Sequence, residues 1–452
     1  MIKVLKSFDD KSVCILGLGY VGLTLAIVMA DVGFNVHGVE VREDVLEKLS
    51  KGTPHFHEPG LSVKLKRVVE SKKLTFSKSI PLARQHSVYI VTVGTPLDKN
   101  KKSRMDMIEN VSHEIAQHIK EGDLIIMRST VKLGTTRNIV MPILQKTGVN
   151  FELAFCPERT LEGNALKELY SLPQIVGGTT KSATVRASQI FQYITPTVIR
   201  VSDVETAEMI KLIDNAQRDV MFAYANEVAR ACDVVGISAT EVIRFGGLGY
   251  PRSNLSVPGP VGGPCLAKDS HILAEGLLDL GITPEITLMA RKINERQPEE
   301  SVQFIKKYTK TLKDFPRVPK ISLLGLAFKG QPETDDLRGT MAIPVLEAIK
   351  NHFPNAILYG YDPIVSREAI HGLGLVPCHT LQEAMMEANI VLILNNHPVF
   401  TTMPIEDYFH YLASSGFVYD YWNLFSTKKL NLPIGRNYIG LGSHGHSVKV
   451  PA

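Results

Sequence analysis

The stretch Val13-Cys-Ile-Leu-Gly-Leu-Gly-Tyr-Val-Gly22 decides the fold of this chain. It opens with an apolar run of strand length, and the residues after it have the apolar character of a buried helix. The GxGxxG spacing between them permits a tight turn, a close approach of the backbone to a pyrophosphate, and close packing of helix on strand. The helix N-terminus then attracts the phosphates. The residues predicted to bind a dinucleotide here are Gly17, Gly19, Tyr20, Val21 and Gly22.

Glu40 extends this prediction to the choice of cofactor. It ends a second apolar strand, about twenty residues beyond the glycines, where a carboxylate binds a ribose diol. A carboxylate would repel a 2′-phosphate, so NAD is favoured over NADP. The nearby Arg42 weakens this preference slightly.

Strands and helices alternate through the first 200 residues, which predicts a parallel sheet covered on both faces. The same alternation of strands and helices recurs near the C-terminal end. We therefore predict an α/β protein with two Rossmann-like, doubly wound parallel-sheet domains, at 1–200 and 319–452. The strands predicted for them lie at 13–17, 35–40, 87–93, 123–127 and about 153–155, and then at 320–325, 356–361, 390–394 and 417–420.

A different pattern fills the middle of the chain. Ser202-Asp-Val-Glu205 is a capping box, and it opens a run without Gly or Pro that reaches Val235. A helix of this length exceeds the globular average and could join the domains and form a dimer surface. A buried helix within one domain is the alternative. We predict a central helical and dimerisation domain at 201–308, with a Gly/Pro-rich loop at 245–264.

Composition excludes several classes of function. The 452 residues are 44% hydrophobic and 21% charged, with a net charge of +4 and no long Lys/Arg run, which disfavours nucleic-acid and membrane-surface binding. Five scattered cysteines without a CxxC pair indicate no disulfide framework and favour the reducing cytoplasm. The apolar segment 13–34 is broken by glycines and Asp31, so it resembles neither a signal peptide nor a membrane span. No metal site is predicted.

Cys265 is the most informative single residue. It lies where the Gly/Pro-rich loop runs into helix-compatible sequence, and a helix start favours the thiolate form. Asp269, four residues on, would share its helix face. A thiol nucleophile together with a nicotinamide site suggests oxidation through a sulfur-bound acyl intermediate.

Further candidates carry weaker local signals. Lys211 and Asn215 are spaced i, i+4, so they could stabilise one oxyanion or form a solvated helix face. Glu158 follows a strand end and is a candidate general base, or a surface carboxylate. Thr130 also ends a strand and could bind a water, bind the cofactor or cap a helix.

The first turn of the last domain, Leu326-Ala-Phe-Lys329-Gly, lacks the three-glycine fingerprint. A second full dinucleotide site is therefore not expected. Basic residues near this turn could still hold a phosphate or a carboxylate, or form ordinary surface charge.

Taken together, the chain resembles the nucleotide-sugar 6-dehydrogenase family, which comprises UDP-glucose, UDP-N-acetylhexosamine and GDP-mannose dehydrogenases. The likeness covers nearly the whole chain. It rests on ordered elements at 17–22, Gly94-Thr95-Pro96, Ser129-Thr130-Val131, Pro157-Glu158-Arg159 with Glu162-Gly163, Lys211 with Asn215, Gly262-Gly263-Pro-Cys265 with Lys268-Asp269, and Phe328-Lys329 with Asp336-Leu-Arg338.

The resemblance implies that NAD oxidises the C6 hydroxyl of a nucleotide sugar twice, through a thiohemiacetal and a thioester on Cys265, to a uronate. Lys211 and Asn215 would stabilise the oxygen at C6, Asp269 and Thr130 would organise the water, and Glu158 would assist proton transfer. Implied cofactor contacts are Glu40, Thr95, Thr130, Glu162, Lys268 and Arg338. Implied substrate contacts are Glu158, Glu162, Lys211, Asn215, Gly262 and Lys329, with Arg252 reaching the partner subunit's substrate in a homodimer.

Local cues to the sugar are mixed. The sequence of the long predicted helix from Thr206 and the pair Pro251-Arg252 resemble the UDP-N-acetylhexosamine branch. Pro264 and Lys268-Asp269 resemble UDP-glucose enzymes instead. Asp420-Tyr-Trp-Asn423 lacks the Arg that follows this Asp in UDP-glucose dehydrogenases. We expect a UDP-N-acetylhexosamine of unspecified epimer. The alternatives are UDP-glucose, a β-hydroxyacid dehydrogenase and a nucleotide-sensing module without turnover.

Overall fold

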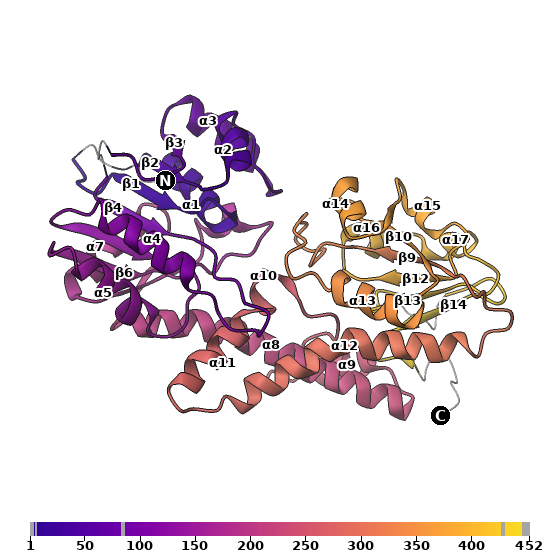
Figure 1. Ribbon diagram of the computed structural model, residues 1–452. Helices are drawn as coiled ribbons and strands as arrows, with labels where there is room; N and C mark the ends of the chain where they lie inside the picture. Colours follow the sequence, from indigo (N-terminus) through magenta and orange to yellow (C-terminus); the bar gives the residue numbers. More distant parts are fainter. Residues whose placement is uncertain (1–3, 5–6, 83–85, 426–429, 445–452) are drawn as a thin grey trace. The chain divides into compact units, whose positions relative to one another are not determined.

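The structure, a computed structural model, describes residues 4, 7–82, 86–425 and 430–444. Its contacts divide the chain into two compact units. The first comprises residues 1–215 and 271–283, and the second comprises residues 216–270 and 284–452. Each has its own sheet covered by helices, mostly parallel in the first unit and wholly parallel in the second (Figure 1).

In the described part of the first unit, eight strands form one sheet in the order β3-β2-β1-β4-β5-β6-β7-β8. Neighbouring strands run parallel except β6 and β7, which are antiparallel. The strands are β1 (Ser12–Leu16), β2 (Asn35–Val39), β3 (Leu74–Ser77), β4 (Val88–Val91), β5 (Asp123–Met127), β6 (Phe151–Phe155), β7 (Gln174–Gly178) and β8 (Val198–Arg200).

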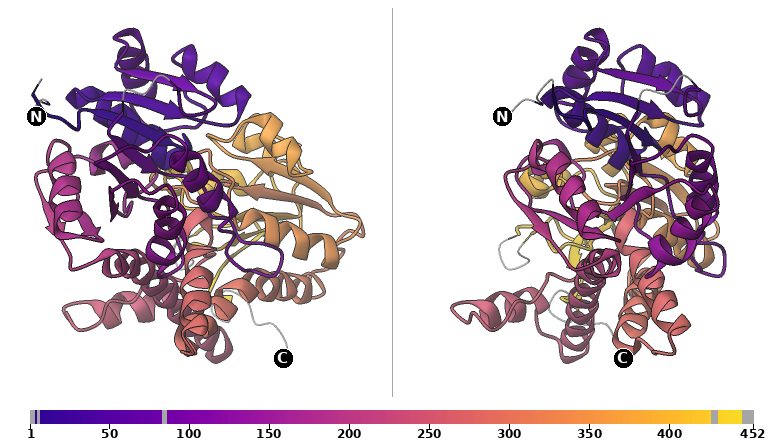
Figure 2. Two further views of the ribbon diagram at one scale, coloured as in Figure 1. Left: turned by 60° about the vertical axis from the view of Figure 1, so that its left-hand side comes forward. Right: turned by 90° about the vertical axis from the view of Figure 1, so that its left-hand side faces the viewer.

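Alternating side chains of the buried strands enter two different cores. Val13 and Ile15 of β1 point to one face, and Cys14 and Leu16 point to the other. The first face is covered mainly by α1, α3 and α7, and the second by α4, α5 and the start of α8, a layering that Figure 2 shows from two further directions. The helices of this unit are α1 (Tyr20–Val32), α2 (Glu43–Ser50), α3 (Leu61–Glu70), α4 (Asp106–Ala116), the π-helical η1 (Thr136–Val140), α5 (Met141–Gln145), α6 (Ala165–Glu168) and α7 (Lys181–Gln192).

The long helix predicted after Ser202 is confirmed as α8 (Val204–Val235), and the division between the units falls within it. Its cap differs from the prediction. Asp203, not Ser202, accepts the free N–H of Thr206 at 2.8 Å, so the helix begins one residue later than the capping box indicated.

The described part of the second unit has a six-stranded, wholly parallel sheet in the order β11-β10-β9-β12-β13-β14. One face packs against α12, α13 and α14, and the other against α15, α16 and α17. The strands are β9 (Lys320–Leu324), β10 (Ile357–Tyr361), β11 (Val376–Pro377), β12 (Ile390–Ile393), β13 (Phe417–Asp420) and β14 (Asn437–Gly440). The remaining helices are α9 (Ala239–Gly247), α10 (Gly263–Leu266), α11 (Asp269–Asp279), α12 (Glu285–Thr309), α13 (Ala342–His352), α14 (Arg367–Gly372), α15 (Leu381–Met385), α16 (Pro398–Thr402) and α17 (Ile405–Phe409).

The two predicted sheets and every predicted strand are confirmed, whereas β3, β7, β8, β11 and β14 were not predicted. After the loop the chain forms two separate helices, α11 and α12, and Gly281 between them adopts a φ of +76°. Within the described ranges, no helix is long and apolar enough to cross a bilayer.

The glycine turn makes a direct prediction about two substitutions. A Cβ at Gly22 would lie 1.9 Å from the carbonyl oxygen of Gly17, whereas a Cβ at Gly19 would meet nothing within 4 Å. Gly22→Ala should therefore destabilise the fold by about 1–3 kcal/mol, as overpacking does. Gly19→Ala should keep the melting temperature and weaken only dinucleotide binding. Thermal unfolding and calorimetric titration with NAD measure both effects, and a Gly22→Ala variant with unchanged stability would contradict this geometry.

Candidate active site

The cofactor turn is held by the carboxylate at the end of β2. Glu40 accepts the backbone N–H of Leu18 at 3.1 Å on one oxygen and that of Arg42 at 3.1 Å on the other. Gly17 provides the turn with a φ of +91°, a value that side chains disfavour. These bonds orient the Glu40 carboxylate beside the turn, as binding of a ribose diol requires.

The start of α1 fits a pyrophosphate. Gly19 is its N-cap residue and makes no side-chain cap hydrogen bond, so the first helical N–H groups are not occupied by a capping side chain. The open space beside Gly19 leaves room for phosphates to approach these groups. The first unit thus fits a bound dinucleotide at the predicted residues.

Two loops after neighbouring strands are tied together next to this turn. The Thr95 hydroxyl donates to the carbonyl of Thr130 at 2.5 Å, and the Ser129 hydroxyl donates to the carbonyl of Val93 at 2.7 Å. The structure therefore brings Thr95 and Thr130 together at the carboxyl ends of β4 and β5, the edge where ligands of open α/β sheets bind.

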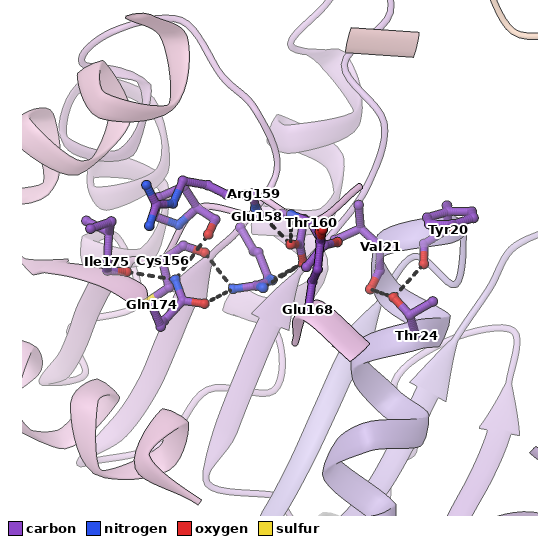
Figure 3. Close-up of polar contacts among 12 residues, drawn as sticks. Tyr20, Val21, Thr24, Cys156, Glu158, Arg159, Thr160, Glu168, Gln174 and Ile175 are labelled. Carbon is purple, nitrogen blue, oxygen red and sulfur yellow. Dashed lines mark hydrogen bonds and ion pairs between the residues drawn. The ribbon is translucent and has the colours of Figure 1, made fainter. Parts of the chain in front are cut away.

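Glu158 lies in the loop after β6 and forms a buried ion pair with Arg128, which directly follows β5. Figure 3 shows Glu158 with its neighbours Arg159 and Thr160. One Glu158 oxygen accepts from the Arg128 guanidinium at 2.6 and 3.1 Å, and the other accepts the N–H groups of Arg159 and Thr160, both at 2.8 Å. The same guanidinium donates to the Gln174 side chain at 2.8 Å. Both carboxylate oxygens are therefore occupied.

The electrostatics agree with this picture. Burial raises the pKa of Glu158, but the Arg128 guanidinium, the Thr160 N–H and the Lys211 ammonium together hold that pKa below its ordinary value. These bonds give Glu158 an anchoring role in its loop, and its predicted part in proton transfer stays a prediction. Lys211 is itself buried, and its ammonium has the smallest effect of the groups that lower the pKa of Glu158.

The far end of the same loop is fastened by a second buried carboxylate. Glu58 accepts the N–H of Gly163 at 2.6 Å and the hydroxyl of Tyr20, the first residue of α1. The Gly163 N–H also points to the Tyr20 hydroxyl at 2.7 Å. The segment that carries Glu162 is thereby linked to the cofactor helix.

Neither Arg128 nor Glu58 was predicted as a site residue. Their partners lie 30 and 105 residues away in the sequence, so no local spacing reveals them. The one usable signal is that Arg128 directly follows the buried strand β5, since a charge at such a position must be paired.

Cys265 is the exposed member of the five cysteines, and the other four are buried. Burial raises the pKa of Cys14 and Cys156 to about 12 and that of Cys378 to about 11. These thiols remain protonated and inaccessible, so Cys265 presents the accessible sulfur nucleophile of this chain.

The loop before Cys265 packs backbone against backbone. Gly263 donates its N–H to the carbonyl of Gly339 at 2.7 Å, and a Cβ at Gly262 would lie 2.3 Å from that carbonyl oxygen. Gly263 has a φ of +94° and faces the ring of Phe328. The structure thus gives Gly262 a packing function, while its predicted substrate contact stays a prediction.

The helix predicted at Cys265 is shorter than expected. α10 is a single turn, and Asp269 begins the separate helix α11, so the shared helix face predicted for Cys265 and Asp269 is wrong. Asp269 is fully buried and accepts from Lys268 at 3.0 Å. Any helix-dipole effect on Cys265 comes from one turn only.

A carboxylate also ends the second strand of the second sheet. Asp362 accepts four backbone N–H groups, those of Leu326 and Ala327 on one oxygen and those of Ile364 and Val365 on the other, at 2.7–3.1 Å. Glu40 accepts two. Because Asp362 is saturated by its own backbone, it cannot hold a ribose diol as Glu40 can.

The basic candidates of the second unit have identifiable surroundings. The Lys329 ammonium lies 5.3 Å from the centre of the Phe328 ring. Arg338 binds both oxygens of Asp336, and Arg252 is exposed with its guanidinium 4.6 Å over the ring of Tyr250. Their predicted ligand contacts stay predictions.

The predicted residues fall into two groups. The first unit holds the cofactor turn with Thr95, Thr130, Glu158, Glu162, Lys211 and Asn215, and the second holds Arg252, Gly262, Cys265, Lys268, Asp269, Lys329 and Arg338. Their convergence on one substrate carbon stays a prediction.

A Rossmann-type cofactor site in one unit and an exposed thiol in the other define a dinucleotide-dependent oxidoreductase. The chain matches three domain models of the UDP-glucose/GDP-mannose dehydrogenase family: the NAD binding domain over residues 11–195, the central domain over 205–296 and the UDP binding domain over 322–427. The chain belongs to this family. It is an NAD-dependent nucleotide-sugar dehydrogenase, and the predictions of family, fold class and cofactor are confirmed.

Individual relatives agree along almost the full length. The chain is 32% identical to the UDP-N-acetyl-D-mannosamine dehydrogenase of Methanococcus maripaludis, over 88% of this chain and 89% of the relative. It is 30% identical to the NDP-N-acetyl-D-galactosaminuronic acid dehydrogenase of Ralstonia nicotianae, over 87% and 92%. The solved UDP-D-ManNAc dehydrogenase from Pyrococcus horikoshii superimposes with a TM-score of 0.84 at 29% identity, covering 96% of this chain and all of that one.

The buried Arg128–Glu158 pair predicts a pH-dependent penalty. Arg128→Met leaves a buried carboxylate unpaired and should cost about 3–5 kcal/mol at neutral pH, whereas Arg128→Met with Glu158→Gln should cost less than the two single changes added. The folded state lowers the pKa of Glu158, so the ion pair stabilises the protein at pH values above the pKa of the unfolded-state carboxyl. The loss of unfolding free energy caused by Arg128→Met should therefore shrink as the pH falls below that unfolded-state pKa. Urea unfolding across pH measures this, and additive costs would contradict the ion pair.

Proposed function

We propose that this protein oxidises the C6 hydroxyl of a UDP-N-acetylhexosamine twice and releases the uronate. The observation that carries the proposal is the exposed sulfur of Cys265 in a chain whose other thiols are buried. The sugar is inferred from relatives named for N-acetylated hexosamines, namely mannosamine and galactosaminuronic acid, so the epimer is left open.

NAD, held at the turn that Glu40 fixes, would supply the acceptor for the hydride that C6 loses twice, once from the alcohol and once from the thiohemiacetal. In the first oxidation the C6 hydroxyl also loses its proton to solvent, which leaves an aldehyde. We infer that Lys211 and Asn215, one turn apart on α8, hold the C6 oxygen during this step. Glu158 supports this by keeping a negative charge near the Lys211 ammonium.

The thiolate of Cys265 then forms a bond to the aldehyde carbon, and the C=O electron pair moves onto the oxygen held by Lys211 and Asn215. Loss of the second hydride restores the C=O bond and gives the thioester. A water organised by Asp269 and Thr130 attacks this carbon, the C–S bond breaks with its electron pair returning to sulfur as the thiolate, and a carboxylate forms with release of two protons. One water and two NAD are consumed per sugar.

The rest of the assignment follows the domain models. We infer that residues 1–200 bind NAD, with Glu162, Lys268 and Arg338 completing the cofactor site, and that residues 319–452 bind the UDP moiety, with Lys329 contacting the substrate. Residues 201–308 form the dimerisation domain. A β-hydroxyacid dehydrogenase needs no thiol and lacks a second Rossmann-like domain, so the six-stranded second sheet disfavours that alternative.

Exposed apolar side chains of the second unit support a homodimer. Phe245, Leu248 and Tyr250 are 56%, 74% and 46% exposed on and after α9, and Val234 and Val235 end α8. Exposed apolar patches on soluble proteins commonly mark interaction surfaces. Arg252 stands beside them, and we infer that it reaches the substrate of the partner subunit.

The thiol mechanism predicts a change in stoichiometry. Cys265→Ala should still oxidise the alcohol, so NADH per sugar should fall from two towards one, an aldehyde should become trappable by hydroxylamine, and uronate formation should fall by more than about 100-fold. Cys232→Ala, which truncates a buried thiol, should keep two. The assay is run on UDP-glucose, UDP-N-acetylglucosamine, UDP-N-acetylgalactosamine and UDP-N-acetylmannosamine. Full uronate yield from Cys265→Ala rejects the thioester route.

If Arg252 contacts the substrate of the partner subunit, two inactive variants should restore activity in a mixed dimer. Arg252→Ala and Cys265→Ala should each be inactive in uronate formation, but mixed and reassociated subunits should regain about a quarter of wild-type activity, because half of the dimers are hybrids with one complete site. Failure of the mixture to recover activity, with hybrids shown by native mass spectrometry, would place Arg252 outside the partner's site.

A further inference from the structure

A buried asparagine holds the beginning of the cysteine loop. Asn226 of α8 accepts the Gly259 N–H at 2.9 Å and donates to the Gly259 carbonyl at 3.1 Å. The Asn226 side chain is almost inaccessible. It therefore satisfies both backbone groups of Gly259, as a neighbouring strand would.

A buried arginine holds the other end. Arg291 of α12 donates to the carbonyl of Leu266, the residue directly after Cys265, at 2.7 Å. Its Nε lies 3.4 Å from the carboxylate of Asp219 on α8, and both side chains are almost fully buried. The pairing offsets the cost of burying the guanidinium beside the loop.

The two anchors belong to one network. Asn294 of α12 donates to the Asp219 carboxylate at 2.7 Å and to its carbonyl at 2.9 Å, and it accepts from Asn226 at 3.0 Å. Ser270, just after the loop, donates to Asp219 at 3.0 Å. Every member lies in the second unit, as does Cys265.

We propose that this network positions the Cys265 sulfur for its attack on the aldehyde, so that Asn226, Asp219, Arg291 and Asn294 are positioning residues of the second oxidation. A loop with four glycine and proline residues between its anchored ends has little stiffness of its own beyond its prolines, and the anchors supply what is missing. The proposal rests on the proposed function, because only a reaction through the thiol needs this loop held in place.

The first hydride transfer does not involve sulfur. Its rate therefore distinguishes a misplaced Cys265 from a general loss of protein stability. A displacement of the nucleophile by about 1 Å lowers the rate of bond formation by up to 100-fold. Loosening the loop should therefore slow uronate formation from the aldehyde and leave oxidation of the alcohol nearly unchanged. Partial unfolding would reduce both alike.

The test uses Asn226→Ala in the full-length protein, with Glu227→Ala, the exposed next residue on α8, as the matched control. For Asn226→Ala we expect uronate formation to fall about 10–100-fold, aldehyde to become trappable, and the first NADH of a single turnover to form within about threefold of the wild-type rate. Hydrogen exchange of the 259–266 amides should quicken, with exchange elsewhere and the melting temperature close to the control. Arg291→Lys keeps a positive charge beside Asp219 but loses the planar guanidinium that also binds the Leu266 carbonyl. It should likewise slow uronate formation and speed exchange of the 259–266 amides.

Three results would contradict the positioning role. If hydrogen exchange of the 259–266 amides is unchanged in both variants, the network does not hold the loop, whatever the reaction is. If that exchange becomes faster but the ratio of aldehyde to uronate stays unchanged, the network holds the loop without affecting catalysis. Equal loss of both oxidations with a lowered melting temperature in Asn226→Ala and Arg291→Lys also overturns the positioning role. If Cys265→Ala itself makes full uronate, the proposed function fails, and that result is independent of the exchange data.

Discussion

A sulfur nucleophile must be open to its substrate and yet fixed in place, and the backbone of residues 259–266 meets both requirements. Its middle lies so close to Gly339 that only glycine fits, with the Gly263 N–H bonded to that carbonyl at 2.7 Å. Its two ends are bonded to the buried side chains of Asn226 and Arg291. These bonds use backbone groups of Gly259, Gly263 and Leu266, and Cys265 itself is exposed.

In the first unit, too, buried side chains hold loops by bonding to their backbone groups. There the buried groups are carboxylates, whereas in the second unit they are an amide and a guanidinium. Glu40 fixes the glycine turn, while Glu158 and Glu58 fix the start and end of the loop that carries Glu162. Backbone N–H groups supply most of the donors, so the loops are positioned by a few buried charges. Asp362 shows the limit of this device, since a carboxylate saturated by four N–H groups no longer binds a ligand.

Much of the architecture could be predicted because it is encoded locally. Apolar strands, the glycine spacing and the uninterrupted run of α8 are patterns within one segment, and these predictions held. The unpredicted strands are short or poorly patterned, such as β8 with three residues, and they form through pairing with distant neighbours. The break after α10 was missed because one turn of non-helical backbone leaves no mark in composition.

The site was less predictable for a different reason. Residue types and spacing pointed to Cys265 and Glu40 and left Lys211 open between a site residue and a solvated helix face. The buried partners Arg128 and Glu58 lie far from the groups they bind in sequence. Arg128 pairs with Glu158 and so anchors the loop that carries it, and that pairing of two charges 30 residues apart follows only from the fold.

The central claim is a covalent bond between Cys265 and the oxidised carbon. Turnover of the wild-type protein with UDP-N-acetylmannosamine, or whichever panel sugar it oxidises fastest, is stopped with acid in the millisecond range, followed by proteolysis and mass spectrometry of the Cys265 peptide. The account predicts a sugar adduct on this peptide at the mass of the thioester, rising and decaying before uronate accumulates. Rapid uronate production with an unmodified Cys265 peptide at every time point would contradict it.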